Sequence, residues 1–296
     1  MQSKMEYDVL REHKNSIKIN EIQWKVFVYL LLVLYTFFVI APVLVSFISS
    51  IRPGEDIFKN IMPFNWHTLI PSRVTVDAYI ILFRDYSFGR VLINSFLVAV
   101  ATVVGGILIN AMAGLAFAIF RFRGRNILFL FVLITFMVPF EAISIPLFQL
   151  INNLGLVNSY WALILPGLAN GLVIFLFRQF FMGLPITLFE SALIDGANWF
   201  TIFTKLALPL SRPAALSAGI LLFITQWEAF FYPLLVANKP EYRVIQVAIA
   251  NFFTQYQTLW NLLFAAVVIA AIIPIVLLLP LQRYYVQAIT QSGIKE

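Results

Sequence analysis

Apolar residues in this chain gather into long runs that are separated by short polar segments. A helix of about 20 apolar residues is long enough to cross the ~30 Å hydrocarbon core of a membrane. We therefore predict an all-α integral membrane protein built as a bundle of transmembrane helices. Its six predicted spans are residues 26–49, 95–120, 126–150, 160–181, 214–236 and 259–281.

Several of these runs contain residues that can interrupt a helix, among them Pro274 and Pro280 in the sixth. The third run contains Pro139 and Pro146, and the fourth contains Pro166 and Gly171. A proline lacks the N–H that would satisfy a carbonyl of the preceding turn. In a membrane such a break survives where neighbouring helices or a water-filled cavity satisfy the freed group. The pattern therefore favours a bundle that encloses a pathway.

The composition supports a membrane protein and excludes several kinds of chemistry. Of the 296 residues, 61% are hydrophobic and only 11% are charged, whereas about 25% of a soluble domain is charged. The chain has no cysteine, which excludes disulfides and cysteine-ligated metal sites. His13 and His67 are far apart and lie outside the apolar runs, so no metal or catalytic centre is expected. The sequence has no phosphate-binding loop motif, so we do not expect this chain to hydrolyse ATP.

The basic residues predict the orientation of the spans. The net charge of +6 comes from Lys and Arg residues that flank apolar runs, so membrane topology explains it better than nucleic-acid binding does. The strongest indicator is the short loop RFRGR at 121–125, because short loops obey the positive-inside rule best. We expect a cytoplasmic N-terminal tail at 1–25, a transmembrane domain at 26–285 and a cytoplasmic C-terminal tail at 286–296. The loops predicted to face outward are 50–93, 151–159 and 237–258.

One polar segment, LFESALIDGANWFTIFTKLALPLSRPA at 188–214, departs from the apolar pattern. Pro185 suits the start of a helix in which Glu190 would lie early, where the helix dipole favours an anion. Ala192 is small enough to let another surface approach the backbone, and Gly196 can end the helix in a left-handed conformation. These residues alone leave two interpretations open. The helix either only joins two spans at the membrane surface or is a docking site for a partner.

The same segment resembles the EAA loop of bacterial ABC importer permeases, here about residues 184–213. The family pattern is approximately E-A-A-x-x-D-G-A, followed by a spacer and L-P-x-x-x-P. Ser191 stands in place of the usual first alanine, which exchanges one small residue for another. The matching positions in this chain are Glu190, Ala192, Asp195, Gly196, Ala197, Pro209 and Pro213.

The resemblance extends over about residues 24–296. INSFLVAVATVV at 93–104, AGLAFAIFRFRGRN at 113–126 and the ending QRYYVQAITQSGIKE are similar to family patterns. These stretches point to the carbohydrate-uptake branch, with a resemblance to the second permease subunit of maltose transporters. The chain departs from the family at Glu228, where many relatives have Asn, and at its last residue, Glu296, where glycine is usual.

The resemblance implies a permease subunit that works by alternating access. The EAA helix would insert into a cleft on a cytoplasmic ATPase, with Glu190 in a polar contact, Ala192 and Gly196 on the close-packed face, and Asp195 stabilising the helix end. The other residues implied to act in coupling are Ala197, Pro209, Gly293, Ile294 and Lys295.

The resemblance also implies the partners and the location. A second, different permease and two ATPase subunits would complete the transporter in the inner (cytoplasmic) membrane of a bacterium. ATP and Mg would bind to the ATPase, so no cofactor is expected in this chain. An extracytoplasmic substrate-binding protein would contact the loop at 50–93.

Carboxylates in or beside the apolar runs are candidates for the substrate path. A charge inside a membrane is costly, so Glu141 and Glu228 should face a cavity or a partner, unless they lie at the outer interface. Trp227 and Phe231 add aromatic surface beside Glu228, and Asn94 is a weaker polar candidate. We expect a sugar or oligosaccharide as cargo, with a glycerol phosphate or polyol as the alternative. A proton-coupled secondary transporter would use the two carboxylates but would leave the EAA-like segment without a role.

Overall fold

The computed structural model describes residues 2–59, 66–68, 70–253 and 259–281, with side chains described from residue 23 onward. All elements in that part of the chain are helices, as the apolar runs predict. The α-helices are α1 (Gln2–Ser50), α2 (Asp77–Asp85), α3 (Phe88–Ile119), α4 (Arg125–Met137), α5 (Phe140–Asn153), α6 (Tyr160–Ile164), α7 (Gly171–Met182), α8 (Ile186–Ile194), α9 (Trp199–Ile202), α10 (Leu208–Leu210), α11 (Arg212–Trp227), α12 (Phe231–Val236), α13 (Ile245–Ala250) and α14 (Trp260–Leu278). The short 3₁₀ turns are η1 (Gly54–Asp56), η2 (Trp66–Thr68), η3 (Leu165–Gly167), η5 (Pro240–Tyr242) and η6 (Leu279–Leu281), and η4 (Phe203–Ala207) is π-helical.

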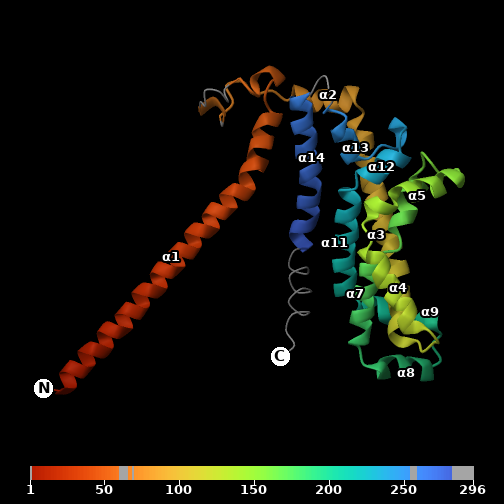
Figure 1. The fold of residues 1–296 in the computed structure, drawn as a ribbon, viewed down its shortest axis with the longest axis horizontal. Coiled ribbons are helices and arrows are strands. Elements are labelled where there is room, and N and C mark those ends of the chain that lie inside the picture. Colours follow the sequence, from red (N-terminus) through yellow and green to blue (C-terminus); the bar gives the residue numbers. More distant parts are fainter. Residues whose placement is uncertain (1, 60–65, 69, 254–258, 282–296) are drawn as a thin grey trace.

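The helices able to cross a membrane fall into two kinds. Three are continuous: 23–50 within α1, α3, and α14 with η6. Three more spans arise only if each bent helix pair counts as one. The pair α4 and α5 bends by 101°, the pair α6–η3 and α7 by 44°, and the pair α9–α10 and α11 by 80°. Figure 1 shows α8 at one end of the bundle and α2 at the other, and we call these the α8 end and the α2 end.

The helix bounds differ from the predicted spans in several places, beginning with α1, which starts at Gln2 rather than at residue 26. α3 begins at Phe88 rather than Ser95. Pro139 lies at the break between α4 and α5, but Pro146 sits inside α5 without interrupting it. The predicted span 214–236 is not one helix, because α11 ends at Trp227 and α12 is separate. The apolar run continues through the break, so hydropathy alone could not reveal that the chain turns there.

The centre of the bundle is α3, which packs against α7 and α11. Small residues make this approach possible. A Cβ atom added to Gly114 would lie 2.6 Å from the Cβ of Phe177 on α7, and one added to Gly106 would lie 2.8 Å from Cδ1 of Leu222 on α11. Helices in membranes associate largely through such close packing, since lipid is as apolar as leucine and supplies no hydrophobic driving force.

The break between η3 and α7 is stabilised by a buried side chain from α3. The amide of Asn110 donates from Nδ2 to the carbonyl of Leu168 at 2.8 Å, and its Oδ1 accepts from the backbone N–H of Asn170 at 2.9 Å. Asn170 in turn caps α7 by accepting from the N–H groups of Leu172 and Val173. The broken helix thus finds the hydrogen-bond partners that a membrane interior requires.

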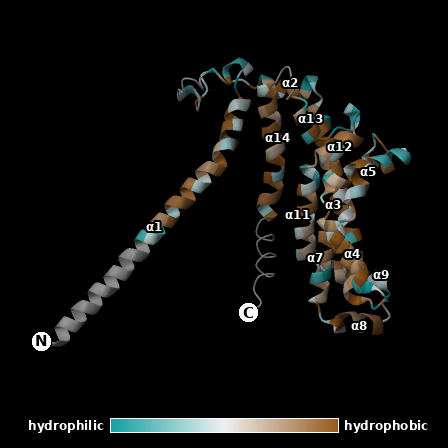
Figure 2. Cartoon of the chain, in the orientation of Figure 1, coloured by the Kyte–Doolittle hydropathy of each residue, from teal (hydrophilic) through white to brown (hydrophobic). Residues whose placement is uncertain are grey.

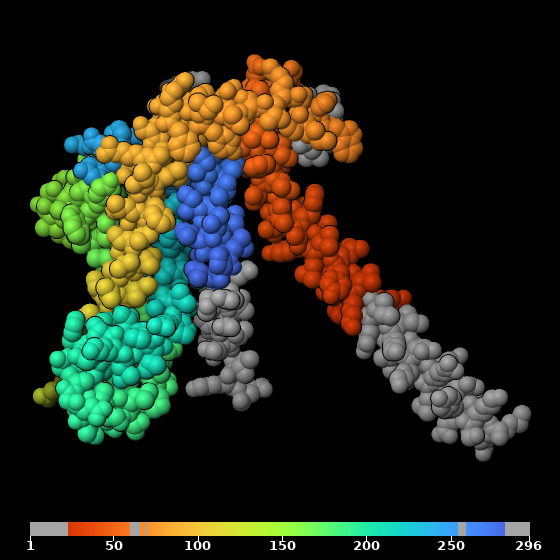
Figure 3. Space-filling view, turned by 180° about the vertical axis from the view of Figure 1, so that it is seen from behind, coloured from red at the N-terminus to blue at the C-terminus, as the bar shows by residue number. Residues whose placement is uncertain are grey.

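Helix α1 diverges from the other helices, as Figures 1 and 3 show. It packs against α14 at the α2 end, where Ser50 Oγ lies 2.7 Å from the hydroxyl of Tyr79 on α2. The most apolar 18-residue stretch of the candidate span within α1 has no residue buried by the rest of the chain, and burial is confined to Ser49 and Ser50 at its end. Its surface is strongly apolar (Figure 2), which suits contact with lipid or with another membrane protein.

Replacing Asn110 with alanine should destabilise the bundle. The change leaves the carbonyl of Leu168 and the N–H of Asn170 without their buried partner, and each such group costs roughly 1–3 kcal/mol. Thermal unfolding of the purified protein in detergent should show a Tm several degrees lower than that of the wild type. Asn126→Ala, at an exposed position in α4, is the matched control. Equal Tm values for both variants and the wild type would contradict the role assigned to Asn110.

Candidate coupling loop and transport path

The EAA-like segment forms a short helix with a defined C-terminal cap. At the end of α8, the N–H of Ala197 donates to the carbonyl of Ala192 at 3.0 Å, and the N–H of Gly196 donates to that of Leu193 at 3.0 Å. These two bonds make a Schellman motif. Gly196 has φ +84°, the left-handed conformation that the sequence analysis expected of it. Gly196 is therefore required by the local backbone before any partner is considered, whereas Ala192 contributes only its backbone carbonyl to the cap.

Glu190 does not lie in the first turn of α8. The helix begins at Ile186, so Glu190 is in its middle, and the expected stabilisation by the helix N-terminus is wrong. Glu190 and Asp195 are both exposed and make no ion pair with any residue that the structure describes. Their charges are thus available to something outside this chain.

One face of the loop is held by the bundle and the other is free. Phe189 is 1% exposed and belongs to a core cluster with Phe177 and Phe181 of α7. Ala192 and Ala197 pack against the same cluster. On the opposite side, the side chains of Ile194 and Phe200 are 86% and 76% exposed. Exposed apolar side chains next to unpaired carboxylates suit a docking surface, and they equally suit contact with the membrane interface.

The loop connects to α11 through a sequence of short helical pieces. Asn198 caps α9 by accepting from the N–H of Thr201 at 2.8 Å, and the π-helical turn η4 and α10 follow. Pro209 lies in α10 and is exposed, and the fully buried Ser211 marks the 80° bend into α11. A displacement of α8 would therefore reach α11 through ordered structure rather than through a slack linker.

Arginines cap the nearby C-terminal end of α3. Arg178 Nε donates to the carbonyl of Phe117 at 3.3 Å, and its guanidinium carbon lies 4.1 Å from the ring centre of Phe129. Arg125 Nη1 donates to the carbonyl of Phe120 at 3.3 Å. Cations are favourable at a helix C-terminus, so these arginines stabilise the end of α3. They also contribute to the positive charge of the α8 end.

Two carboxylates and an aromatic ring predicted for the substrate path lie on neighbouring elements. Glu141 is in the first turn of α5 and Glu228 is at the C-cap of α11, and both are exposed. The rings of Phe140 and Tyr232 meet edge to face at 5.6 Å, which brings the start of α5 beside α12. Phe231, the first residue of α12, is 40% exposed.

The other two candidates for the substrate path are buried and already hydrogen-bonded. Trp227 is 3% exposed, stacks on Phe223 and donates from Nε1 to the carbonyl of Ala270 at 3.1 Å. Asn94 is 1% exposed. Its Nδ2 donates to the carbonyls of Glu241 and Arg243 at 2.9 and 3.0 Å, and its Oδ1 accepts from the hydroxyl of Tyr160 at 2.8 Å.

Other polar residues inside the bundle were not predicted from the sequence. Thr102 and Asn110 lie in α3, and Gln226 in α11 donates to the carbonyl of Leu163 at 3.4 Å. The hydroxyl of Thr102 is buried and makes no hydrogen bond with a described residue. A signal was present, since Asn94, Thr102 and Asn110 follow one another at equal spacing in one apolar run. The sequence could not show which backbone groups they satisfy.

Comparison with known proteins places the chain in a family. Residues 106–291 match the family described as binding-protein-dependent transport system inner membrane component. The arabinooligosaccharides transport system permease protein AraQ of Halalkalibacterium halodurans is 35% identical, over 88% of this chain and 92% of that protein. The sn-glycerol-3-phosphate transport system permease protein UgpE of Yersinia pestis is 30% identical, over 90% of this chain and 96% of that protein.

A solved structure shares the fold. It is that of a bacterial ABC transporter involved in the import of the acidic polysaccharide alginate, and the matched chain is 23% identical with a TM-score of 0.75. The match covers 88% of this chain and 96% of that one. On the family match and the identity to these relatives, the chain belongs to the inner membrane components of binding-protein-dependent transport systems.

Proposed function

We propose that this chain is one of two different permease subunits of an ATP-driven importer that works by alternating access. The observation that carries the proposal is the geometry of α8. Its buried side is anchored by Phe189, its C-terminus is closed by Gly196, and its outer side presents Ile194 beside unpaired carboxylates. Two separate ATPase subunits would bind ATP and Mg and grip this helix, so the chain itself needs no cofactor.

The proposed orientation places the α8 end in the cytoplasm with both chain termini. The arginines around α3 and α4 support this placement through the positive-inside rule. The α2 end would then face outward and meet an extracytoplasmic substrate-binding protein. Gly293, Ile294 and Lys295 lie outside the described residues, and their contact with the ATPase is part of the proposal on family grounds.

Within the loop, we assign Glu190 a polar contact with the ATPase. Asp195 lies beside the helix cap. Gly196 has open space around it, since a Cβ there would meet no atom within 4 Å. This space is where a partner surface could approach the backbone. Pro209 would help to hold the connection to α11 stiff.

The proposed cargo is a sugar or an oligosaccharide. The name of the AraQ relative supports this class, and that of the UgpE relative supports glycerol phosphate as the second candidate. Glu141, Glu228 and Phe231 are the residues best placed to touch cargo, because they are exposed on adjoining elements. A proton-coupled transporter would leave the capped and exposed α8 without a use.

The docking role of Gly196 can be separated from backbone strain by a matched pair of variants. Gly196 and Gly155 both have positive φ, +84° and +69°, and a Cβ at either would meet no atom within 4 Å. Leucine at each position should therefore carry a similar conformational cost of about 1–2 kcal/mol. We expect Gly196→Leu to abolish uptake and coupled ATP hydrolysis while membrane insertion stays normal, and Gly155→Leu to transport. Normal transport in Gly196→Leu would refute the docking role, and equal losses in both would assign the effect to strain.

The proposed contact of Glu228 with cargo predicts a change in substrate-stimulated ATP hydrolysis. Glu228→Gln removes the charge while keeping the shape. In the reconstituted transporter it should shift the cargo concentration for half-maximal stimulation by several-fold. Glu241→Gln, at an exposed position in η5, should leave it unchanged. If Glu228→Gln matches the wild type in both affinity and rate, Glu228 is not in the path.

A further inference from the structure

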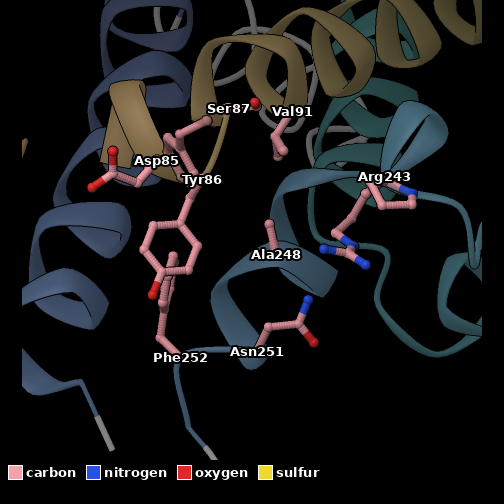
Figure 4. A pocket seen from close by; sticks show the side chains of 10 residues that line it. Asp85, Tyr86, Ser87, Val91, Arg243, Ala248, Asn251 and Phe252 are labelled. Atoms are coloured by element: carbon pink, nitrogen blue, oxygen red, sulfur yellow. The ribbon is translucent and has the colours of Figure 1, made fainter. Parts of the chain in front are cut away.

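A cavity of about 260 Å³ lies at the α2 end, between the turn that joins α2 to α3 and the segment from η5 to α13. Liquid water occupies roughly 30 Å³ per molecule, so the cavity can hold a small polar group together with several waters. Figure 4 shows side chains that line it. They include Tyr86, Ser87, Arg243, Ala248, Asn251 and Phe252.

Three polar side chains of this cavity have no partner in the part of the chain that the structure describes. The guanidinium of Arg243 makes no ion pair or side-chain hydrogen bond there, and neither does the carboxamide of Asn251 nor the hydroxyl of Tyr86. In Figure 4 the guanidinium and the carboxamide point toward the same space. A half-buried guanidinium without a counter-charge favours an anion, and its fork of N–H donors matches a carboxylate or phosphate.

Asp85, the acidic residue in the cavity wall, is an ionised carboxylate that is already paired with Arg84. Arg84 donates to both of its oxygens, from Nε at 2.7 Å and from Nη2 at 3.1 Å. These hydrogen bonds lower the pKa of the Asp85 carboxyl below its ordinary value and keep it paired. Figure 4 shows this carboxylate turned away from Arg243. The charge that the cavity presents to a ligand is therefore positive.

The wall is held in place by its own contacts. Tyr86 packs edge to face on Phe252 with ring centres 5.0 Å apart. Ser87 has φ +49°, a left-handed conformation that costs a residue with a Cβ about 1–2 kcal/mol. The backbone of Arg243 is fixed by the hydrogen bond that its carbonyl accepts from Asn94. Strain kept at a cavity wall is a feature of sites that position a ligand.

We propose that this cavity is a binding site for an oxyanion, a carboxylate or a phosphate, with Arg243 as its charged anchor. Asn251 would donate a further hydrogen bond to the same group, and the ring of Tyr86 forms part of the wall. Ser87 and Phe88 lie at the N-terminus of α3, where the helix dipole is positive. This partial charge adds to that of Arg243, which remains the main charge of the site. Two sources share this chemistry: a free acidic solute that approaches the α2 end, and an acidic side chain of a protein that docks there.

The wild-type full chain in nanodiscs allows a test that requires no mutation. Phenylglyoxal modifies accessible arginines, and mass spectrometry reports the rate at Arg243 and at the exposed Arg90, which does not line the cavity. Sodium glucuronate, inorganic phosphate and an acetylated Gly-Glu-Gly amide are the three probes, with glucose and sodium chloride at equal ionic strength as controls. We expect an oxyanion to slow modification of Arg243 roughly tenfold or more and to leave Arg90 unchanged.

The probes distinguish the two sources. Protection by glucuronate or phosphate alone assigns the site to a free solute, and protection by the peptide alone assigns it to a partner's side chain. The proposal is overturned if no probe protects Arg243, or if Arg90 is protected equally. A transport defect would not affect this readout, so the proposed import function and the anion site can fail separately.

A variant gives an independent check. Arg243→Gln removes the charge but retains the backbone carbonyl that holds Asn94, so the fold should be preserved. Calorimetric titration of the full chain with whichever probe protects Arg243 should show at least a tenfold loss of affinity in Arg243→Gln, and little loss in Arg90→Gln. Equal losses of affinity in both variants would mean that general surface charge causes the effect, and would contradict the proposal.

Discussion

The constraint on which this structure depends is that a broken helix inside a membrane must find partners for its freed backbone groups. Three helix pairs are bent, each forming one span if the two helices are counted together, and at the break before α7 the required hydrogen bonds come from Asn110 of α3 and from Asn170 itself. A bundle of unbroken helices would not need these additional hydrogen bonds. Breaks of this kind are positions at which the two helices of a bent pair would be able to change their relative angle.

The same helix that satisfies the break also connects the two ends of the molecule. α3 packs closely on α7 and α11 through glycines, so these helices form one mechanical unit. α8 is anchored to that unit by Phe189, and the ordered turns after it lead into α11. A force applied to α8 would thus act on the helices that lie next to the breaks. At these breaks the angle between paired helices can vary. Under the proposed function, this continuity would be the physical basis for coupling ATP hydrolysis on a partner to movement of this chain.

The sequence predicted much of this and failed at identifiable points. Apolar runs were enough for the all-α membrane fold, and the left-handed Gly196 followed from its place in a charged segment. The end of α11 at Trp227 was missed, because an apolar run looks the same whether the chain continues or turns back. Trp227 and Asn94 look like ligand residues in sequence, yet their polar atoms bond to distant backbone. Such long-range pairing has no local signature.

The central claim is that α8 is gripped by an ATPase subunit. The chain has no cysteine, so Ile194→Cys places a single reactive thiol at an 86% exposed position on α8. A benzophenone maleimide attached there can be photolysed in native membranes and its adducts identified by mass spectrometry. The account predicts an adduct with a nucleotide-binding subunit, and none when the thiol is placed by Ile70→Cys at the α2 end, where the side chain is 65% exposed. Adducts from Ile194→Cys with lipid alone, or adducts with the nucleotide-binding subunit from both positions, would contradict it.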